Sequence, residues 1–225
     1  MMRIQMAKYS TVHKVVYFVR HGESEANTAP VVQSPESPLS ELGRHQAQLI
    51  AERATQLRFD ALISSPFARA RETAQEIAQD TEADVEYSDL FVERLKPSSI
   101  NGKPFTDPAA SAIWERWEES LFTPEIRVED GENFDDLVAR ADRALSFLEG
   151  RPEHALLVVT HGYFLRTVIA RMLMRDALTG SIHRAFQSSF VSQNTGMTVI
   201  RLENNALESA PRWRLFTFND HSHLR

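Results

Sequence analysis

Short apolar runs that stop at polar residues recur along the chain. Residues 15–22 have the sequence Val-Val-Tyr-Phe-Val-Arg-His-Gly, and residues 155–162 have the similar sequence Ala-Leu-Leu-Val-Val-Thr-His-Gly. A third run, Ala-Leu-Ile-Ser-Ser-Pro, occupies residues 61–66. Short runs rich in β-branched and aliphatic residues are typical of strands in a sheet that is covered on both faces. The pattern therefore predicts parallel strands that end at polar side chains.

Helical patterns alternate with these runs. Ser40 can cap a helix over residues 41–57, Pro66 can open a second helix with Ser65 as its cap, and Asn133 can cap a helix over residues 134–148. This alternation predicts one α/β domain over residues 1–225, folded as a three-layer α/β/α sandwich with a mostly parallel central sheet. Residues 1–13 are expected to be peripheral or disordered.

The alternation stops over residues 94–130. This segment is expected to be a lid inserted after the third strand, with a helix that opens at Asp107-Pro108 and has Trp114 and Trp117 on its packed face. Its basic side chains, Arg94, Lys96 and Lys103, could contact a distal charge of a substrate or could simply be solvated.

The polar strand ends predict a binding crevice. In open α/β sheets, ligands bind at the carboxyl ends of the strands. Arg20 and His21 follow the first strand, Arg69 lies just after the run at residues 61–66, and His161 follows a later strand. Guanidinium groups match phosphate with paired, charge-assisted hydrogen bonds, so phosphate is the favoured ligand.

Three motifs in this order resemble those of a known family. The motifs are Arg-His-Gly-Glu-Ser at residues 20–24 followed by Asn27, Ser-Ser-Pro-Phe-Ala-Arg-Ala-Arg-Glu-Thr-Ala at residues 64–74, and Thr-His-Gly at residues 160–162. Together they resemble the histidine phosphatase superfamily, which includes the cofactor-dependent phosphoglycerate mutases. The resemblance extends from about residue 15 to the end of the chain.

The resemblance implies a reaction and the residues that perform it. A neutral imidazole can attack phosphorus, so His21 is the expected nucleophile, and Arg20, Arg69 and His161 would neutralise the phosphoryl oxygens. The family motifs further imply that Asn27 and Gly162 contact the substrate. They also imply a carboxyl group after the third strand that acts as acid and base. Glu93 is the favoured candidate for it and Asp89 the alternative.

Three functions remain open at this stage. The first is a metal-independent phosphomonoesterase that hydrolyses a small phosphorylated substrate and needs no cofactor. The second is a mutase that uses the same phosphohistidine chemistry, which is disfavoured because residues 94–130 lack the long lid expected of a mutase. The third is a phosphate-binding module without catalysis, which is disfavoured because every polar group that the reaction needs is present.

Composition limits the kinds of partner that we expect. The formal net charge is −6, from 25 Lys and Arg against 31 Asp and Glu, so no basic field for nucleic acid is expected. The chain has no cysteine, which excludes disulfides and cysteine metal sites. Since neither a signal peptide nor a membrane span is recognised, we expect a cytoplasmic monomer or homodimer that binds no membrane. His221 and His223 could approach the crevice or belong to a polar tail outside it, and the tail is favoured.

Overall fold

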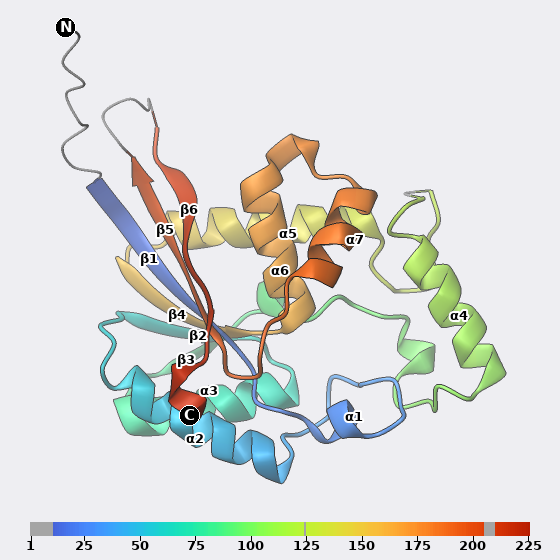
Figure 1. The fold of residues 1–225 in the computed structure, drawn as a ribbon, viewed down its shortest axis with the longest axis horizontal. Helices are drawn as coiled ribbons and strands as arrows, with labels where there is room; N and C mark the ends of the chain where they lie inside the picture. The colour runs from blue at the N-terminus through green and yellow to red at the C-terminus, as the bar shows by residue number, and fades with distance from the viewer. Residues whose placement is uncertain (1–10, 124, 205–209) are drawn as a thin grey trace, which may run out of the picture.

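The fold is built around one mixed sheet. The computed structural model describes residues 11–123, 125–204 and 210–225. Six strands in these ranges are arranged in the order β3-β2-β4-β1-β5-β6 (Figure 1). Their bounds are Thr11–Arg20 for β1, Ala61–Ser64 for β2, Val85–Tyr87 for β3, Ala155–Thr160 for β4, Met197–Asn204 for β5 and Arg212–Asp220 for β6.

The prediction of a mostly parallel sheet is only partly right. Strand β4 pairs in parallel with β1 and β2, and β2 pairs in parallel with β3. Strand β5 is antiparallel to β1, and β6 is antiparallel to β5. The last two strands follow each other closely in the chain, and a short connection can join antiparallel neighbours but not parallel ones.

Helices cover both faces of the sheet, as the three-layer prediction requires (Figure 1). One face packs against α2 (Glu41–Ala54) and α3 (Ala68–Thr81). The other packs against α5 (Phe134–Gly150) and α6 (Gly162–Met174), and α7 (Gly180–Ser189) contacts α6. Alternate residues of β4 serve the two layers, because successive strand side chains point to opposite faces. Leu156 and Val158 join one core cluster, whereas Leu157 and Val159 join the other.

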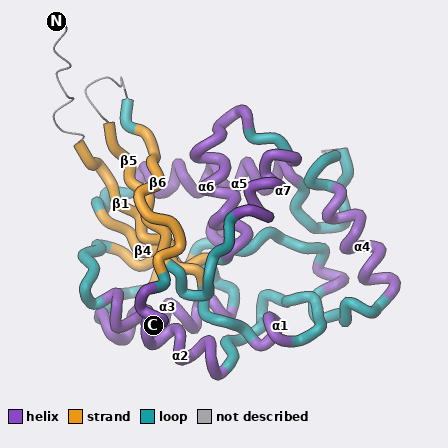
Figure 2. Tube along the Cα trace, viewed as in Figure 1, coloured by secondary structure: helices purple, strands orange, loops and turns teal. Residues whose placement is uncertain are grey.

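The described part of residues 94–130, which we call the lid, lies beside this sandwich and consists mostly of loops (Figure 2). Its helix α4 (Pro108–Glu119) begins as predicted, since the Asp107 carboxylate accepts hydrogen bonds from the amides of Ala109 and Ala110. The remaining helical elements are short: α1 (Glu25–Thr28), η1 (Asp89–Phe91), η2 (Ser98–Ile100), η3 (Arg175–Ala177) and η4 (Ser222–Leu224).

Of the N-terminal segment at residues 1–13, only residues 11–13 can be compared with the structure. Residues 1–10 lie outside the described residues. Residues 11–13 belong to β1, where Thr11 and Val12 pair with Asn204 and Glu203 of β5, and all three form an exposed end of that strand. They extend the sheet because the long antiparallel partner β5 offers them backbone hydrogen bonds.

Helix α2 begins against the turn that follows β1. Ser40 caps the helix as predicted, because its hydroxyl accepts a hydrogen bond from the Gly43 amide at 3.0 Å. A Cβ atom at Gly43 would lie 1.8 Å from the carbonyl oxygen of Glu23, so only glycine allows this approach. The turn at residues 21–23 is thus held in place by the first turn of α2.

We predict that Gly43→Ala lowers the free energy of unfolding by about 1–3 kcal/mol, because the added methyl group must push the two backbones apart. Gly150→Ala is the matched control, since a Cβ atom there meets nothing within 4 Å. Urea denaturation should show the control to be neutral or slightly stabilising. Equal stability of the Gly43→Ala variant and the unmodified protein would contradict this packing.

Candidate active site

The two strand-end histidines lie together in the interior. Arg20 of β1 is paired with Thr160 of β4, so the residues that follow, His21 and His161, leave the sheet side by side. Their ring centroids are 5.0 Å apart, and the exposed fractions of the two residues are 2% and 0%. The parallel register therefore brings the predicted imidazoles together.

Hydrogen bonds fix the tautomer of His21. Its Nδ1 atom lies 2.6 Å from the carbonyl oxygen of Gly22, and a carbonyl oxygen can only accept, so Nδ1 carries the proton. Nε of Arg69 donates to Nε2 of His21 at 3.1 Å. Since arginine can only donate, Nε2 must hold a lone pair. Both contacts define a neutral imidazole with its proton on Nδ1 and its lone pair on Nε2.

Two guanidinium groups accompany the histidines. Arg69 is buried in the first turn of α3 and also donates to the carbonyl oxygen of Ser34 at 3.1 Å. Arg20 donates from Nη1 to the carbonyl oxygen of Ser192 at 2.5 Å, whereas its buried Nε has no hydrogen-bond partner among the described residues. By contrast, Arg71 is exposed.

Burial and positive charge keep both imidazoles neutral. Burial, with the charges of Arg69 and Arg20, lowers the pKa of His21 well below 6.5. Burial, again with Arg69, lowers the pKa of His161 well below the same value. Burial lowers the pKa of Arg69 to about 10, which leaves its guanidinium protonated at neutral pH.

Ser65 contacts His161 and does not cap a helix, which corrects the predicted start of α3. Its hydroxyl lies 2.8 Å from Nε2 of His161. Helix α3 begins at Ala68 with Phe67 as its cap residue. The amide of Phe67 donates to the same hydroxyl, so Ser65 joins the turn before the helix. Nδ1 of His161 is buried and has no partner among the described residues.

Glu93 lies at this site, whereas Asp89 does not line it. The Glu93 carboxylate accepts hydrogen bonds from the amides of Phe164 at 2.8 Å and Tyr163 at 3.2 Å. It therefore sits at the N-terminus of α6, where the helix dipole favours negative charge. Asp89 is exposed in η1. Of the two candidate carboxyl groups, only Glu93 lines the cavity that His21 also lines.

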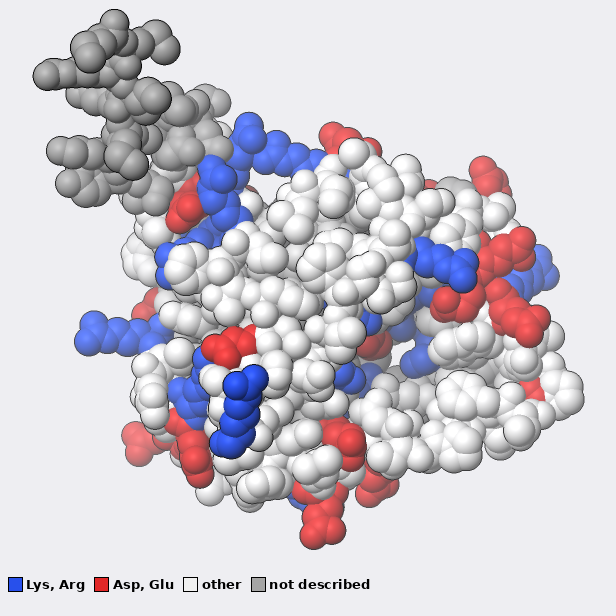
Figure 3. Space-filling model, viewed as in Figure 1, with Lys and Arg blue, Asp and Glu red and all other residues white. Residues whose placement is uncertain are grey.

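Two cavities meet at Glu93. The first, which we call the crevice, has a volume of about 350 Å³ and is lined by Arg20, His21 and Gly162 among others. The second, which we call the lid chamber, has a volume of about 460 Å³ and lies against α4. The two cavities share four of their lining residues: Asn27, Gln33, Glu93 and Tyr163. A hollow with charged side chains on its walls is visible between the α4 side and the main body (Figure 3).

Asn27 and Gly162, which the motifs implied as substrate contacts, both line the crevice. Oδ1 of Asn27 accepts hydrogen bonds from the amide and hydroxyl of Ser24, each at 3.0 Å, so its amide NH₂ group is the donor it can offer a ligand. A Cβ atom at Gly162 would lie 2.9 Å from Oγ of Ser192 and 3.2 Å from Nε of Arg20. Glycine therefore allows α6 to begin directly beside the Arg20 guanidinium.

The crevice also contains polar side chains that the sequence motifs do not indicate, among them Arg166, Gln187 and Ser192. Arg166 donates to Oε1 of Gln187 and to Oγ of Ser192, both at 2.7 Å. Its position four residues after Gly162 places it on the same helical face, which is a signal that could have identified it. Ser192 precedes β5, whose antiparallel pairing brings its start to the end of β1.

The basic residues of the lid differ in role. The buried Arg94 guanidinium is bonded to Glu118 at 2.8 Å and to the carbonyl oxygen of Trp117 at 2.7 Å, so it holds the lid together. Lys96 lines the lid chamber and donates to the carbonyl oxygen of Gln33 at 3.0 Å. Burial lowers the pKa of Lys96 to about 8. Lys103 is exposed and lines neither cavity.

The C-terminal tail that carries His221 and His223 does not line the crevice, and hydrogen bonds hold His223 in place. Nε2 of His223 lies 3.0 Å from Oγ1 of Thr195, and its Nδ1 lies 3.2 Å from Nη1 of Arg53. The Thr195 amide donates to the carbonyl oxygen of Arg20 at 2.9 Å. The tail therefore supports the backbone behind the active site.

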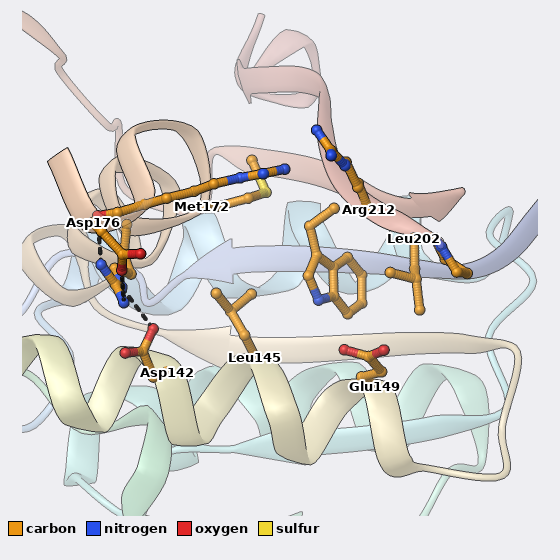
Figure 4. Close-up of a pocket in the computed structure, with 11 residues that line it drawn as sticks. Asp142, Leu145, Glu149, Met172, Asp176, Leu202 and Arg212 are labelled. Carbon is orange, nitrogen blue, oxygen red and sulfur yellow. Dashed lines mark hydrogen bonds and ion pairs between the residues drawn. The ribbon is translucent and has the colours of Figure 1, made fainter. Parts of the chain in front are cut away.

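Another cavity, of about 360 Å³, lies at the opposite end of α6 (Figure 4). Its Arg171 is bonded to Asp142 at 2.7 Å and to Asp176 at 3.1 Å. It shares no lining residue with the crevice.

Within the described residues, no group of three or more His, Cys, Asp or Glu could hold a metal ion. No helix in these ranges is long and apolar enough to cross a bilayer.

The lowered pKa values predict that His21 and His161 stay neutral at pH 6. Nitrogen-detected NMR of the imidazoles should show His21 with its proton on Nδ1. In the unfolded chain both groups take up protons near pH 6.5, so the free energy of unfolding should fall as the pH drops below that value, by up to about 1.4 kcal/mol per pH unit for each histidine. An imidazolium signal from His21 at pH 6 would contradict this assignment.

Comparison with known proteins identifies the family. The family model described as the histidine phosphatase superfamily (branch 1) matches residues 16–213. A protein named probable phosphoglycerate mutase GpmB from Proteus mirabilis is 35% identical over 162 residues, which cover 70% of this chain and 74% of that protein. The protein of the same name from Escherichia coli K12 is 32% identical over 164 residues, with the same coverage.

Solved structures agree on the fold. A putative α-ribazole-5′-P phosphatase from Escherichia coli has a TM-score of 0.72 at 21% identity, covering 92% of this chain and 96% of that chain. Mycobacterial glucosyl-3-phosphoglycerate phosphatase has a TM-score of 0.70 at 22% identity, covering 92% and 99%. The α/β fold is thus confirmed, and with a family match over most of its length, the chain belongs to the histidine phosphatase superfamily.

Proposed function

We propose that the protein is a metal-independent phosphatase that hydrolyses phosphate monoesters through a phosphohistidine on His21. The observation that carries this proposal is the state of the His21 ring. Its Nδ1 proton is held by the Gly22 carbonyl group, and its Nε2 lone pair faces the Arg69 guanidinium. A neutral imidazole beside fixed positive charge is suited to attack a phosphoryl group.

Buried polar atoms near His21 support a phosphoryl site. Nε of Arg20 and Nδ1 of His161 are buried without partners among the described residues. Buried polar groups normally have partners, so such atoms point to a missing ligand. Phosphoryl oxygens would satisfy them, and Arg69 would shift its hydrogen bond from the imidazole to the phosphate. Arg20, Arg69, His161, Asn27 and Gly162 then form the proposed phosphate site.

The proposed reaction has two displacements. In the first, Nε2 of His21 forms a bond to phosphorus, the bond from phosphorus to the ester oxygen breaks, and Glu93 donates a proton to the leaving alkoxide. In the second, water attacks the phosphohistidine, its proton passes to the Glu93 carboxylate, and the bond from phosphorus to nitrogen breaks. The products are the alcohol and inorganic phosphate. Guanidinium groups supply the positive charge, so no step passes through a metal ion.

A mutase is the second candidate, because the similar proteins from Proteus mirabilis and Escherichia coli are named probable phosphoglycerate mutases. A mutase would return the phosphoryl group from His21 to another hydroxyl of the substrate and not to water. A phosphoglycerate carries a carboxylate in addition to its phosphate, so the charges of the lid chamber bear on the choice between a mutase and a phosphatase. That chamber is lined by two acidic side chains, Glu93 and Glu118, as well as two basic ones.

Phosphate release from a panel of small phosphate esters tests the proposal. We expect free phosphate with and without a bisphosphoglycerate primer, unchanged activity in EDTA, and a loss of at least about 1,000-fold in kcat/KM for His21→Ala. His45→Ala, a change at an exposed residue of α2, is the matched control. Primer-dependent isomerisation without phosphate release would identify a mutase, and full activity of His21→Ala would overturn the nucleophile.

The proton donor is tested by pairing substrates with different leaving groups. Glu93→Gln should reduce kcat/KM for an alkyl phosphate by about 100-fold or more, because the alkoxide needs a proton. The loss for p-nitrophenyl phosphate should be much smaller, since p-nitrophenolate leaves without protonation. Asp89→Asn is the control and should leave both substrates unaffected. A selective loss in Asp89→Asn would transfer the role to that residue.

A further inference from the structure

Aromatic rings from the lid form one wall of the lid chamber. Trp114 and Trp117 of α4 have ring centroids 5.2 Å apart at an interplanar angle of 64°. Phe105 packs edge-on against Trp114 at 6.1 Å. Phe105 is 53% exposed and Trp114 is partly exposed, although both line the chamber. Trp117 is only 3% exposed and the Arg94 guanidinium lies 3.6 Å over its ring, so the apolar surface that this wall offers to a ligand comes from Trp114 and Phe105.

Small apolar side chains also line the lid chamber. Ala29, Val31 and Val32 line the chamber from the loop after α1. Backbone hydrogen bonds tie this loop to the lid: the Val32 amide donates to the carbonyl oxygen of Lys103 at 2.8 Å, and the Phe105 amide donates to that of Pro30 at 3.1 Å. The two segments that line the chamber are therefore held together without a ligand. A chamber lined by small apolar residues and exposed aromatic rings suits a flat apolar group.

The charges that line the chamber are balanced. Arg94 is paired with Glu118 at 2.8 Å, and Lys96 has Glu93 as its charged neighbour of opposite sign. The crevice, in contrast, is lined by the guanidinium groups of Arg20 and Arg166 against the single carboxyl group of Glu93. The crevice therefore suits an anion, and the chamber offers no surplus positive charge for a second one.

The meeting point of the two cavities orients the substrate. In the proposed reaction the leaving oxygen must lie beside Glu93, and Glu93 lines both cavities. With phosphorus in the crevice, the alcohol portion extends into the lid chamber. We propose, on the basis of the proposed function, that the preferred substrates are phosphate monoesters of uncharged alcohols that carry a flat apolar ring, which packs against Trp114.

Three primary alkyl phosphates test this preference with leaving oxygens of similar chemistry: 2-naphthylmethyl phosphate, glycerol 3-phosphate and 3-phosphoglycerate. We expect kcat/KM for the naphthylmethyl ester to exceed the other two values by about tenfold or more, because stacking contributes only there. Trp114→Ala should lower that value by about tenfold and leave the other two within about twofold, whereas Trp114→Phe, which keeps a ring, should retain most of the preference.

Phe216→Ala is the matched control. Phe216 is 61% exposed on β6 and lines neither cavity, so its removal should leave all three values within about twofold. A preference for 3-phosphoglycerate, or an equal loss for all three esters in Trp114→Ala, would overturn the ring site. That result would leave the proposed phosphatase intact, provided that phosphate release still depends on His21.

A binding measurement separates the ring site from catalysis. Two of the three tryptophans of the chain, Trp114 and Trp117, line the chamber, so the non-hydrolysable 2-naphthylmethylphosphonate should change the intrinsic fluorescence on binding. Trp114→Ala should weaken its affinity about tenfold. If no ester is hydrolysed but this binding holds, the proposed function fails and the ring site stands. Unchanged affinity in Trp114→Ala would overturn the ring site.

Discussion

One buried hydrogen bond, from Nδ1 of His21 to the carbonyl oxygen of Gly22, determines the state of the group on which the site depends. The turn that carries this carbonyl is held from two sides. The Gly22 amide donates to Oγ1 of Thr73 on α3 at 3.1 Å, and a Cβ atom at Gly22 would lie 2.5 Å from the carbonyl oxygen of Gly43 on α2. The packing of two helices against one turn thus fixes the tautomer of the imidazole, so fold stability and chemistry rely on the same contacts.

Burial determines the charge of the site. Desolvation favours neutral imidazoles, whereas guanidinium groups stay protonated because their ordinary pKa is so high. A buried cation is costly unless an anion or several acceptors compensate it. Arg69 has His21 and the Ser34 carbonyl oxygen as acceptors. In the proposed reaction the phosphoryl oxygens supply the missing negative charge, which would make phosphate binding and charge neutralisation the same event.

The sequence was sufficient where local pattern and general topology decide the outcome. Apolar runs that end at His21 and His161 predicted their convergence, because parallel strands share one carboxyl edge. Capping residues such as Ser40 and Asn133 marked helix starts correctly. The pattern failed at Ser65, since a hydroxyl that could cap a helix has a competing partner in His161, which is remote in the chain.

Features that depend on long-range packing could not be predicted. Arg166 belongs to the crevice through partners on and after α7, and the lid chamber exists because residues 30–32 bond to residues 102–105. The spacing from Gly162 marks the helical face that carries Arg166, but neither set of partners leaves a local signature. Arg94 illustrates the same limit: its charge suggested substrate contact, but its donors are taken up by Glu118 and by backbone carbonyl groups within the lid.

The most direct measurement of the central claim is to trap the covalent intermediate. Rapid quenching during turnover of a phosphate ester, followed by mass spectrometry of peptides kept at alkaline pH, locates any phosphoryl group on the chain. We predict one acid-labile phosphoryl group on Nε2 of His21. A phosphoryl group on another residue, or turnover with inversion at phosphorus and no labelled peptide, would contradict it.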